Sequence, residues 1–173
     1  SYFNSLGVKV TVVEMMDEIL SGMDRELAAL LREEYSKKGV SFLLNRKVAA
    51  VKEADGEVVV EFEEDGVQPV ASEKLLLSVG RRPVVKGFGL ENLNLEVTKQ
   101  GYPLVYPCMQ TSIPSVYVCG DLTGFSLLAH TAVCEAEVAA HTLLGKSHSM
   151  SYRAIPGVVY SNPEFAGVGY TEE

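Results

Sequence analysis

The sequence predicts an α/β protein built around open parallel β-structure, and three features predict it. A run of β-branched residues, Val8–Val13, ends at the acid Glu14. A strongly apolar run, Leu75–Val79, ends at a glycine and is typical of a strand buried in a parallel sheet. A third run, Val116–Val118, stops just before Asp121 and is followed by a loop and a helix. Because ligands bind open α/β sheets beyond the carboxyl ends of strands, the two acids are candidate binding residues.

Composition and charge narrow the classes of partner. Apolar residues make up 47% of the 173 positions, which is enough for a buried core. The chain carries 15 basic and 23 acidic residues, and the resulting formal charge of −8 disfavours nucleic acid and anionic membranes as partners. No apolar run approaches the roughly 18–20 residues that a membrane-spanning helix needs. We therefore expect neither a nucleic-acid partner nor a membrane partner.

The three cysteines, Cys108, Cys119 and Cys134, form no closely spaced pair. Cys119 falls in a predicted strand and Cys134 in the helix after it, so we expect both thiols to be buried. An odd cysteine count without a disulfide framework is typical of a reducing compartment, which predicts a cytoplasmic protein. We name no metal ligand.

The first segments alternate between helix and strand. Ser1–Leu6 is expected to end a helix, with Gly7 as the residue that closes it. The strand Val8–Val13 follows. A capped start near Asp24 predicts a helix that runs to Lys38. Four apolar residues at helical spacing predict its buried face: Leu27, Leu30, Leu31 and Tyr35.

A small antiparallel meander is predicted between the parallel strands. Ser41–Leu44 is expected to be the next strand of the open sheet. After it, Asp-Gly pairs at 55–56 and 65–66 flank the alternating run Glu57–Glu63. Asp-Gly between alternating segments is a strong hairpin signal, so the meander is expected to span Val48–Ala71.

The second half is expected to contain less regular structure. Residues 84–107 have the composition of loops. The strand Val116–Val118 and a further loop lead into a helix over Thr131–Leu144, which a glycine closes. A hairpin with strands Ile155–Tyr160 and Ala166–Tyr170 is predicted at the end.

Five motifs together resemble one family. In chain order they are VTVVE (10–14), VGRRP (79–83), TSIPSVYVCGD (111–121), LLAHTAVCE (127–135) and IPGVVYSNPEFAGVGYTEE (155–173). Their order and spacing are similar to those of the flavin-dependent pyridine nucleotide–disulfide oxidoreductases, and most of all to the dihydrolipoamide dehydrogenase branch. The motifs span nearly the whole chain, and together they are highly specific.

The resemblance implies a division into three parts. Residues 1–80 would belong to a partial Rossmann-like NAD-binding domain that carries the antiparallel meander. Residues 81–149 would be the C-terminal part of an FAD-binding domain. Residues 150–173 would begin an α+β interface domain, which makes a homodimer in intact enzymes. The resemblance thus predicts an internal fragment of such an enzyme.

The resemblance also implies contacts to FAD. Asp121 would accept a hydrogen bond from a ribityl hydroxyl. The pyrimidine side of the flavin would meet backbone N–H groups and the positive end of a helix dipole. Those groups would belong to Leu127, Leu128, Ala129 and His130. The His130 side chain by itself is more typical of a cap or a packing residue, and we include it for its backbone.

For NAD, the resemblance implies three positions. Glu14 would bind the two ribose hydroxyls of NAD and repel the extra phosphate of NADP. The backbone of Val48 would meet the adenine, although a plain core valine is an equally good interpretation of this position. Gly80 would let the chain pass close to the nicotinamide, because only a residue without Cβ permits that approach. We assign no catalytic residue.

The intact relative would oxidise dihydrolipoamide, borne by a partner protein or as a small disulfide substrate, through a cysteine pair and FAD to NAD. The family's cysteine pair, phosphate-binding turns and histidine base do not occur among these motifs, so we expect the isolated chain to be inactive. Two alternatives stay open. One is a reductase of the glutathione or mercuric type, which prefers NADP and is disfavoured by Glu14. The other is a non-catalytic nucleotide-binding module.

Overall fold

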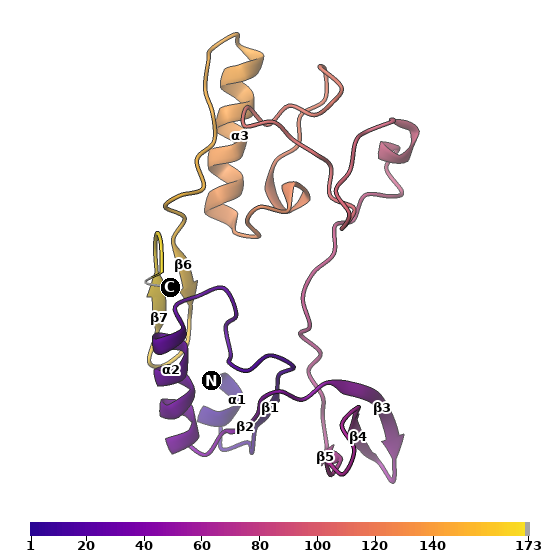
Figure 1. Ribbon diagram of the computed structural model, residues 1–173, viewed down its shortest axis with the longest axis vertical. Coiled ribbons are helices and arrows are strands. Elements are labelled where there is room, and N and C mark those ends of the chain that lie inside the picture. Colours follow the sequence, from indigo (N-terminus) through magenta and orange to yellow (C-terminus); the bar gives the residue numbers. More distant parts are fainter. Residues whose placement is uncertain (172–173) are drawn as a thin grey trace. The chain divides into compact units, whose positions relative to one another are not determined.

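The computed structural model describes residues 1–171 and divides them into two compact units. The first unit joins Ser1–Ser78 to the segment that begins at Pro156, and the second unit is Val79–Ile155. The last two residues of the predicted motif at 155–173 lie outside the described residues. Helices and strands occur in both halves of the chain in the manner of a mixed α/β protein, as predicted (Figure 1).

The elements of the first unit follow the predicted order. They are α1 (Tyr2–Ser5), β1 (Thr11–Val13), α2 (Arg25–Lys37), β2 (Ser41–Leu43), β3 (Val48–Ala54), β4 (Glu57–Phe62), β5 (Val70–Ser72), β6 (Gly157–Val159) and β7 (Phe165–Gly167). Strands β1 and β2 pair in parallel, with Thr11 opposite Ser41, and α2 is the connection between them. This strand, helix, strand unit is the predicted beginning of an open parallel sheet.

Helix α2 starts where the sequence indicates. The side chain of Asp24 accepts a hydrogen bond from the N–H of Leu27 at 2.9 Å, which caps the first turn. Its buried residues are Ala28, Leu31 and Tyr35. The predicted burial of two residues is wrong, because Leu27 and Leu30 are 45% and 50% exposed. The β-structure beside α2 is narrow, and the buried stripe consists of Ala28, Leu31 and Tyr35.

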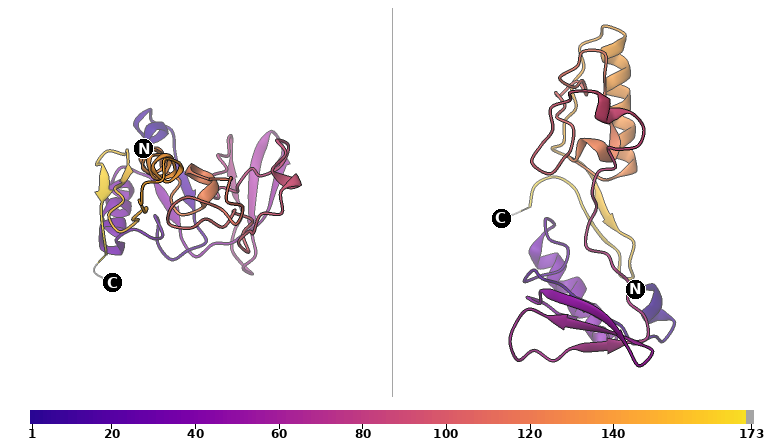
Figure 2. Two further views of the ribbon diagram at one scale, coloured as in Figure 1. Left: turned by 90° about the horizontal axis from the view of Figure 1, so that it is seen from above. Right: turned by 90° about the vertical axis from the view of Figure 1, so that its right-hand side faces the viewer.

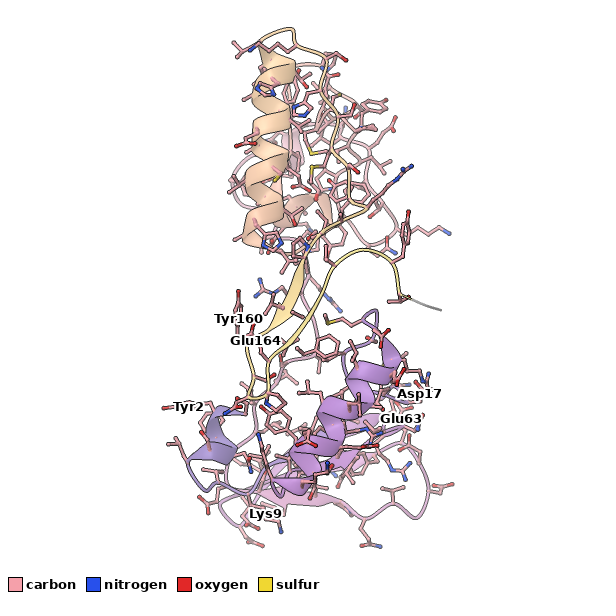
Figure 3. The ribbon with its side chains drawn as sticks, turned by 90° about the vertical axis from the view of Figure 1, so that its left-hand side faces the viewer. Tyr2, Lys9, Asp17, Glu63, Tyr160 and Glu164 are labelled. Atoms are coloured by element: carbon pink, nitrogen blue, oxygen red, sulfur yellow. The ribbon has the colours of Figure 1, made fainter. Side chains whose placement is uncertain are left out.

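The meander is confirmed. β3, β4 and β5 form a three-stranded antiparallel sheet in that order. Ala54 pairs with Glu57 across a two-residue turn, in which Asp55 and Gly56 have φ of 53° and 82°. Positive φ at both turn residues is the arrangement that suits the right-handed twist of a hairpin. Lys47 and Glu63 form an ion pair at 2.8 Å beside the sheet, where Glu63 is labelled in Figure 3.

A small core unites α2 with the C-terminal hairpin. Strands β6 and β7 are antiparallel, as predicted, and Phe165 of β7 packs with Leu31, Tyr35 and Val40. The Tyr35 hydroxyl accepts a hydrogen bond from the backbone N–H of Asn162 at 2.9 Å. The hairpin is thus fixed to α2 through both apolar and polar contacts.

The predicted strand at Leu75–Val79 is wrong. None of these residues pairs with a described strand, and Leu76 and Val79 are 80% and 85% exposed. A parallel strand exists only through hydrogen bonds to its neighbours. In the described sheet, β1 and β2 bond to each other and to no third strand, so an apolar run alone does not create one.

The second unit has one long helix, α3 (Ala129–Leu143), with the short 3-10 helices η1 (Leu90–Asn92) and η2 (Gly120–Thr123). Figure 2 shows α3 in orange beside the loops of this unit. The prediction of a strand at Val116–Val118 is wrong. The segment is extended, but it pairs only briefly: Val116 accepts from Thr111 at 2.9 Å and Val118 donates to Met109 at 3.0 Å.

The core of the second unit is formed by Met109, Val138 and Ala139, with Tyr117, Cys119 and Met150 packed against it. Cys119 is half-buried, and burial raises the pKa of its thiol, with a smaller contribution from Glu135. Cys134 is exposed, so its predicted burial is wrong. The buried stripe of α3 consists of Thr131, Glu135, Val138 and Ala139, and position 134 lies beside it.

Candidate functional site

Glu14 lies directly after β1 and is fixed by the neighbouring chain. Its N–H donates to the carbonyl of Leu43 at 3.0 Å, and its own carbonyl accepts from the N–H of Arg46 at 3.0 Å. The carboxylate accepts one hydrogen bond, from the N–H of Met16 at 3.0 Å. The side chain is half-buried at the carboxyl end of a parallel strand, and its second oxygen has acceptor capacity for a ligand hydroxyl.

Val48 begins β3 and lies opposite Phe62. It is 44% exposed, so the alternative interpretation of a core valine is wrong. Arg46, two residues earlier, donates the hydrogen bond to the Glu14 carbonyl. The structure therefore brings the Glu14 backbone and the start of the meander together in the first unit.

A loop after Glu14 leads to α2 and encloses a shallow pocket of about 210 Å³ along residues 16–25. Two ion pairs fix it. Arg25 pairs with Asp17 at 2.7 Å, near the start of α2 (Figure 3). Arg32 binds Glu18 through two nitrogens, and this hydrogen bonding holds the pKa of the Glu18 carboxyl below its usual value. Sequence analysis missed both pairs, which position the loop that follows Glu14.

Asp121 lies in η2, in the second unit, and its side chain is exposed. The carboxylate accepts a hydrogen bond from Nη1 of Arg81 at 3.3 Å. It also faces a pocket of about 420 Å³. The lining combines cationic, aromatic and apolar side chains with this single carboxylate: Arg81, Arg82, Pro83, Val84, Tyr102, Asp121, Leu122 and Leu127.

The start of α3 adjoins this pocket. Leu127 is part of the lining, Leu128 is the N-cap residue, and Ala129 and His130 are the first two helical residues. A leucine at the N-cap has no side-chain oxygen to accept from the first-turn N–H groups. Leu128 makes no side-chain cap hydrogen bond, and the positive end of the helix dipole lies at this end of α3, where it favours an acceptor on a ligand.

Gly80 precedes Arg81 and has φ of 111°, a conformation that favours glycine. It is exposed, and the structure places it in the second unit with Asp121. Of the predicted site residues, the structure thus brings together Asp121 and the start of α3 in one unit. Glu14 and the start of β3 come together in the other.

Glu135 is the main residue that sequence analysis missed. It is 0% exposed, and it accepts three hydrogen bonds: from the N–H of Gly120 at 2.5 Å, from Thr123 Oγ1 at 3.2 Å and from Tyr152 Oη at 2.7 Å. Burial, together with the hydrogen bond to Glu135, raises the pKa of the Tyr152 hydroxyl, so Tyr152 remains a donor. One feature of the sequence could have indicated its burial: Glu135 is the single acid at the helical spacing of the buried stripe of α3, which also contains Thr131 and Val138.

The described part of the chain contains neither a metal-ligand cluster nor a helix that could span a membrane. No group of three or more histidine, cysteine or acidic side chains there is arranged to hold a metal ion, and all the cysteines are free. None of the described helices has the length and apolar character to cross a membrane.

Comparison with known proteins identifies the family. The family model described as pyridine nucleotide-disulphide oxidoreductase matches residues 1–136. The chain belongs to this family. Within it, the chain is 42% identical to dihydrolipoyl dehydrogenase from Thermus scotoductus and 41% identical to dihydrolipoyl dehydrogenase 3 from Pseudomonas putida. The matches cover 99% and 100% of this chain but 38% of each relative, so the chain spans little more than a third of their length.

Solved structures have the same fold over nearly all of this chain. A crystal structure of LpdA from Mycobacterium tuberculosis gives a TM-score of 0.89 at 29% identity, over 98% of this chain and 37% of that one. The HOCl-induced flavoprotein disulfide reductase RclA from Escherichia coli, as its Cu(II) complex, gives a TM-score of 0.88 at 27% identity. This match covers 98% of this chain and 39% of the RclA chain. The family is one of pyridine nucleotide-dependent flavoproteins, and its two cofactors are FAD and NAD.

The residues present fit parts of both cofactors of a pyridine nucleotide-disulphide oxidoreductase. In the second unit, a carboxylate at the rim of an open pocket and the positive dipole end of α3 suit a polyol chain and a ring with carbonyl acceptors. In the first unit, the carboxylate of Glu14 after a parallel strand suits a pair of ribose hydroxyls. The chemistry of each set of residues is thus consistent with the family's cofactors.

Proposed function

We propose that this chain carries cofactor-binding parts of a flavoprotein that oxidises dihydrolipoamide and reduces NAD. The observation that carries the proposal is the arrangement in the second unit, where Asp121 and the start of α3 adjoin one open pocket. The identity of 42% to a dihydrolipoyl dehydrogenase over 99% of the chain supports this branch of the family. When bound, FAD supplies the redox chemistry between the substrate's sulfur atoms and the nicotinamide.

In the proposed FAD site, Asp121 accepts a hydrogen bond from a ribityl hydroxyl. Leu127, Leu128, Ala129 and His130 present backbone N–H groups to the pyrimidine edge of the flavin. The dipole of α3, which has 15 residues, favours negative charge at that edge. In this structure the Arg81 guanidinium pairs with the Asp121 carboxylate at 3.3 Å. Both side chains are exposed, so the pair can separate when a ribityl hydroxyl donates to Asp121 instead.

In the proposed NAD site, Glu14 binds the two hydroxyls of the adenosine ribose. The same negative charge disfavours the 2′-phosphate of NADP. The exposed start of β3 at Val48 is open to the adenine through its backbone. Considered separately, Gly80 of the second unit has positive φ and is the proposed point of close approach for a nicotinamide.

The proposal extends to partners of the whole protein. A dihydrolipoamide group on a partner protein is the proposed substrate, and a small disulfide is the alternative. The β6–β7 hairpin belongs to the proposed homodimer interface. The odd number of free cysteines favours a reducing compartment such as the cytoplasm.

A second candidate is a disulfide reductase of another branch, of the glutathione or mercuric type. The likeness to the disulfide reductase RclA, with a TM-score of 0.88, favours keeping it. The position of Glu14 argues against the members that use NADP, because a carboxylate repels the additional phosphate. A non-catalytic nucleotide-binding module is the third possibility that the experiment below addresses.

The test is a comparison of substrates with the purified whole flavoprotein that carries this chain. We expect bound flavin by visible absorbance, and NADH formation from dihydrolipoamide and NAD that far exceeds turnover with NADP. Glutathione disulfide with NADPH is the matched control for the reductase alternative. Bound nucleotide without any turnover would favour the module. The 173-residue chain by itself is expected to be inactive, since its three cysteines are free and not closely spaced.

A further inference from the structure

The buried carboxylate of Glu135 lies beneath the turn that carries Asp121. Glu135 belongs to α3, yet its two oxygens accept hydrogen bonds at both ends of η2. Gly120, the first residue of η2, donates its N–H at 2.5 Å, and Thr123, the last, donates its hydroxyl at 3.2 Å. One side chain therefore fixes the whole turn that contains Asp121, from a position that is 0% exposed.

Tyr152 fixes the same carboxylate from the other side. Its hydroxyl donates to Oε1 of Glu135 at 2.7 Å. Its ring stacks on Phe125 at 4.8 Å between centroids, and Phe125 follows η2 by two residues. Tyr152 thus holds both the acceptor and the chain that leaves the turn. Because burial raises the pKa of the Tyr152 hydroxyl, the donor keeps its proton throughout the physiological range.

The donor set suits a carboxylate and no other side chain of this size. A carboxylate accepts at both oxygens, whereas an amide in its place would direct one NH₂ group at a donor. With Glu135→Gln, either the Gly120 N–H or the Tyr152 hydroxyl loses its acceptor, whereas Thr123 can still donate to the Gly120 carbonyl at 3.0 Å. A buried donor without a partner is costly, so the turn is expected to move away from its present position.

We propose that Glu135 and Tyr152 are positioning residues for flavin binding, which hold η2 so that Asp121 faces the flavin's ribityl chain. The inference rests on the proposed function of Asp121, and it adds two residues that are not part of the lining of the pocket. A positioning role differs from a packing role in one respect. Substitution of a positioning residue should weaken flavin binding, and the weakening should depend on the presence of Asp121.

The experiment compares Glu135→Gln with Glu137→Gln, an exposed glutamate two residues further along the same helix. The dissociation constant for FAD is measured by reconstitution of the flavin-free protein, and the melting temperature of the flavin-free form is measured in parallel. We expect Glu135→Gln to bind FAD about tenfold more weakly or worse, and Glu137→Gln to bind it as the wild type does. Tyr152→Phe removes one of the three donors and is expected to weaken FAD binding about threefold. Affinity for NAD should not change.

A double-mutant cycle with Asp121→Asn separates positioning from packing. If Glu135 acts through Asp121, Glu135→Gln weakens FAD binding much less in the Asp121→Asn background than in the wild type. Additive losses, or wild-type affinity in Glu135→Gln, would overturn the inference. Should Glu135→Gln fail to fold, the same cycle with the milder Tyr152→Phe decides. If the wild-type protein binds no FAD, the proposed function itself fails, and that result is distinct from all of these.

Discussion

Two acids of this chain lie in candidate cofactor sites, and they are held in place by different means. Glu14 follows a strand, and main-chain hydrogen bonds to Leu43 and Arg46 fix its backbone on both sides. Asp121 lies in a short 3-10 turn among loops, and no strand of the described chain adjoins it. Its turn depends on the buried side chain of Glu135.

The difference shows how a unit with little sheet can still place a functional group. Regular hydrogen bonding positions Glu14 without any special side chain nearby. In the second unit, a buried polar network replaces the sheet, and such networks fix one conformation only when every member is paired. The second site should therefore be more sensitive to single substitutions than the first.

The largest effect is expected from Met109→Ala, which removes the 0% exposed centre of the second unit's core. The cavity should lower the free energy of unfolding by about 2–5 kcal/mol. The control is Met15→Ala in the first unit, an exposed methionine whose loss should stay within about 0.5 kcal/mol. Urea denaturation of the purified protein measures both. A loss no greater than the control's would mean that the loops around Asp121 do not depend on this core.

Gly124→Ala tests how tightly the chain beyond η2 is confined. Gly124 has φ of +74°, and an added Cβ would lie 2.7 Å from Cγ of Tyr102. We expect about 2–4 kcal/mol of destabilisation, from backbone strain and steric overlap together. Gly145→Ala is the matched control, because its φ is +72° and no atom lies within 4 Å, and it should cost about 1 kcal/mol. Equal losses in the two variants would show that Tyr102 yields freely.

Paired substitutions of the acids sharpen the comparison directly. Glu14→Gln should weaken NAD binding about tenfold and leave FAD binding unchanged, because it removes a charged hydrogen-bond acceptor. Asp121→Asn should weaken FAD binding about tenfold and leave NAD binding unchanged, for the same reason. Titration of each cofactor into each variant provides the measurement. Loss of both affinities in either variant would contradict the assignment of one acid to each cofactor.

The pH dependence of stability should reveal the ion pair beside the first site. Hydrogen bonding from Arg32 lowers the pKa of Glu18 from its ordinary value of 4.5, so the folded protein binds this proton more weakly than the unfolded chain does. The pair's contribution is complete above pH 4.5 and is lost as the pH falls through the lowered pKa. Glu18→Gln should cost about 1–2 kcal/mol at pH 7, with a smaller difference from wild type below pH 4. A difference independent of pH would exclude this linkage.

The smallest effect is expected from Arg81→Ala. The Arg81 and Asp121 side chains are 71% and 55% exposed, so solvent screens their pairing. The free energy of unfolding should change by no more than about 0.5 kcal/mol in urea denaturation. A larger loss would mean that Arg81, and not the buried carboxylate alone, holds Asp121 in position.

Local signals predicted the elements that depend on local interactions. The Asp24 cap defined the start of α2, and the Asp55-Gly56 pair defined the turn between β3 and β4. The helix α3 and the hairpin β6–β7 were also predicted from their boundaries. Each of these features is decided by residues within a few positions of one another, which is why the sequence indicates them.

The errors concern features that depend on distant partners. The apolar run Leu75–Val79 has the composition of a strand, but no described strand pairs with it. The run Val116–Val118 pairs only with the short segment near Met109. Glu135 was missed for the same reason, since its donors come from positions 12–17 residues away and meet it only in the folded chain.

The network around Glu135 also imposes an order of events on a newly made chain. Gly120 precedes its acceptor by 15 residues, and Glu135 in turn precedes Tyr152 by 17. The turn at Gly120–Thr123 therefore emerges from the ribosome before either of the groups that close it. We expect this segment to take its final form late in biosynthesis, so that loading of the flavin follows the folding of α3 rather than guiding it.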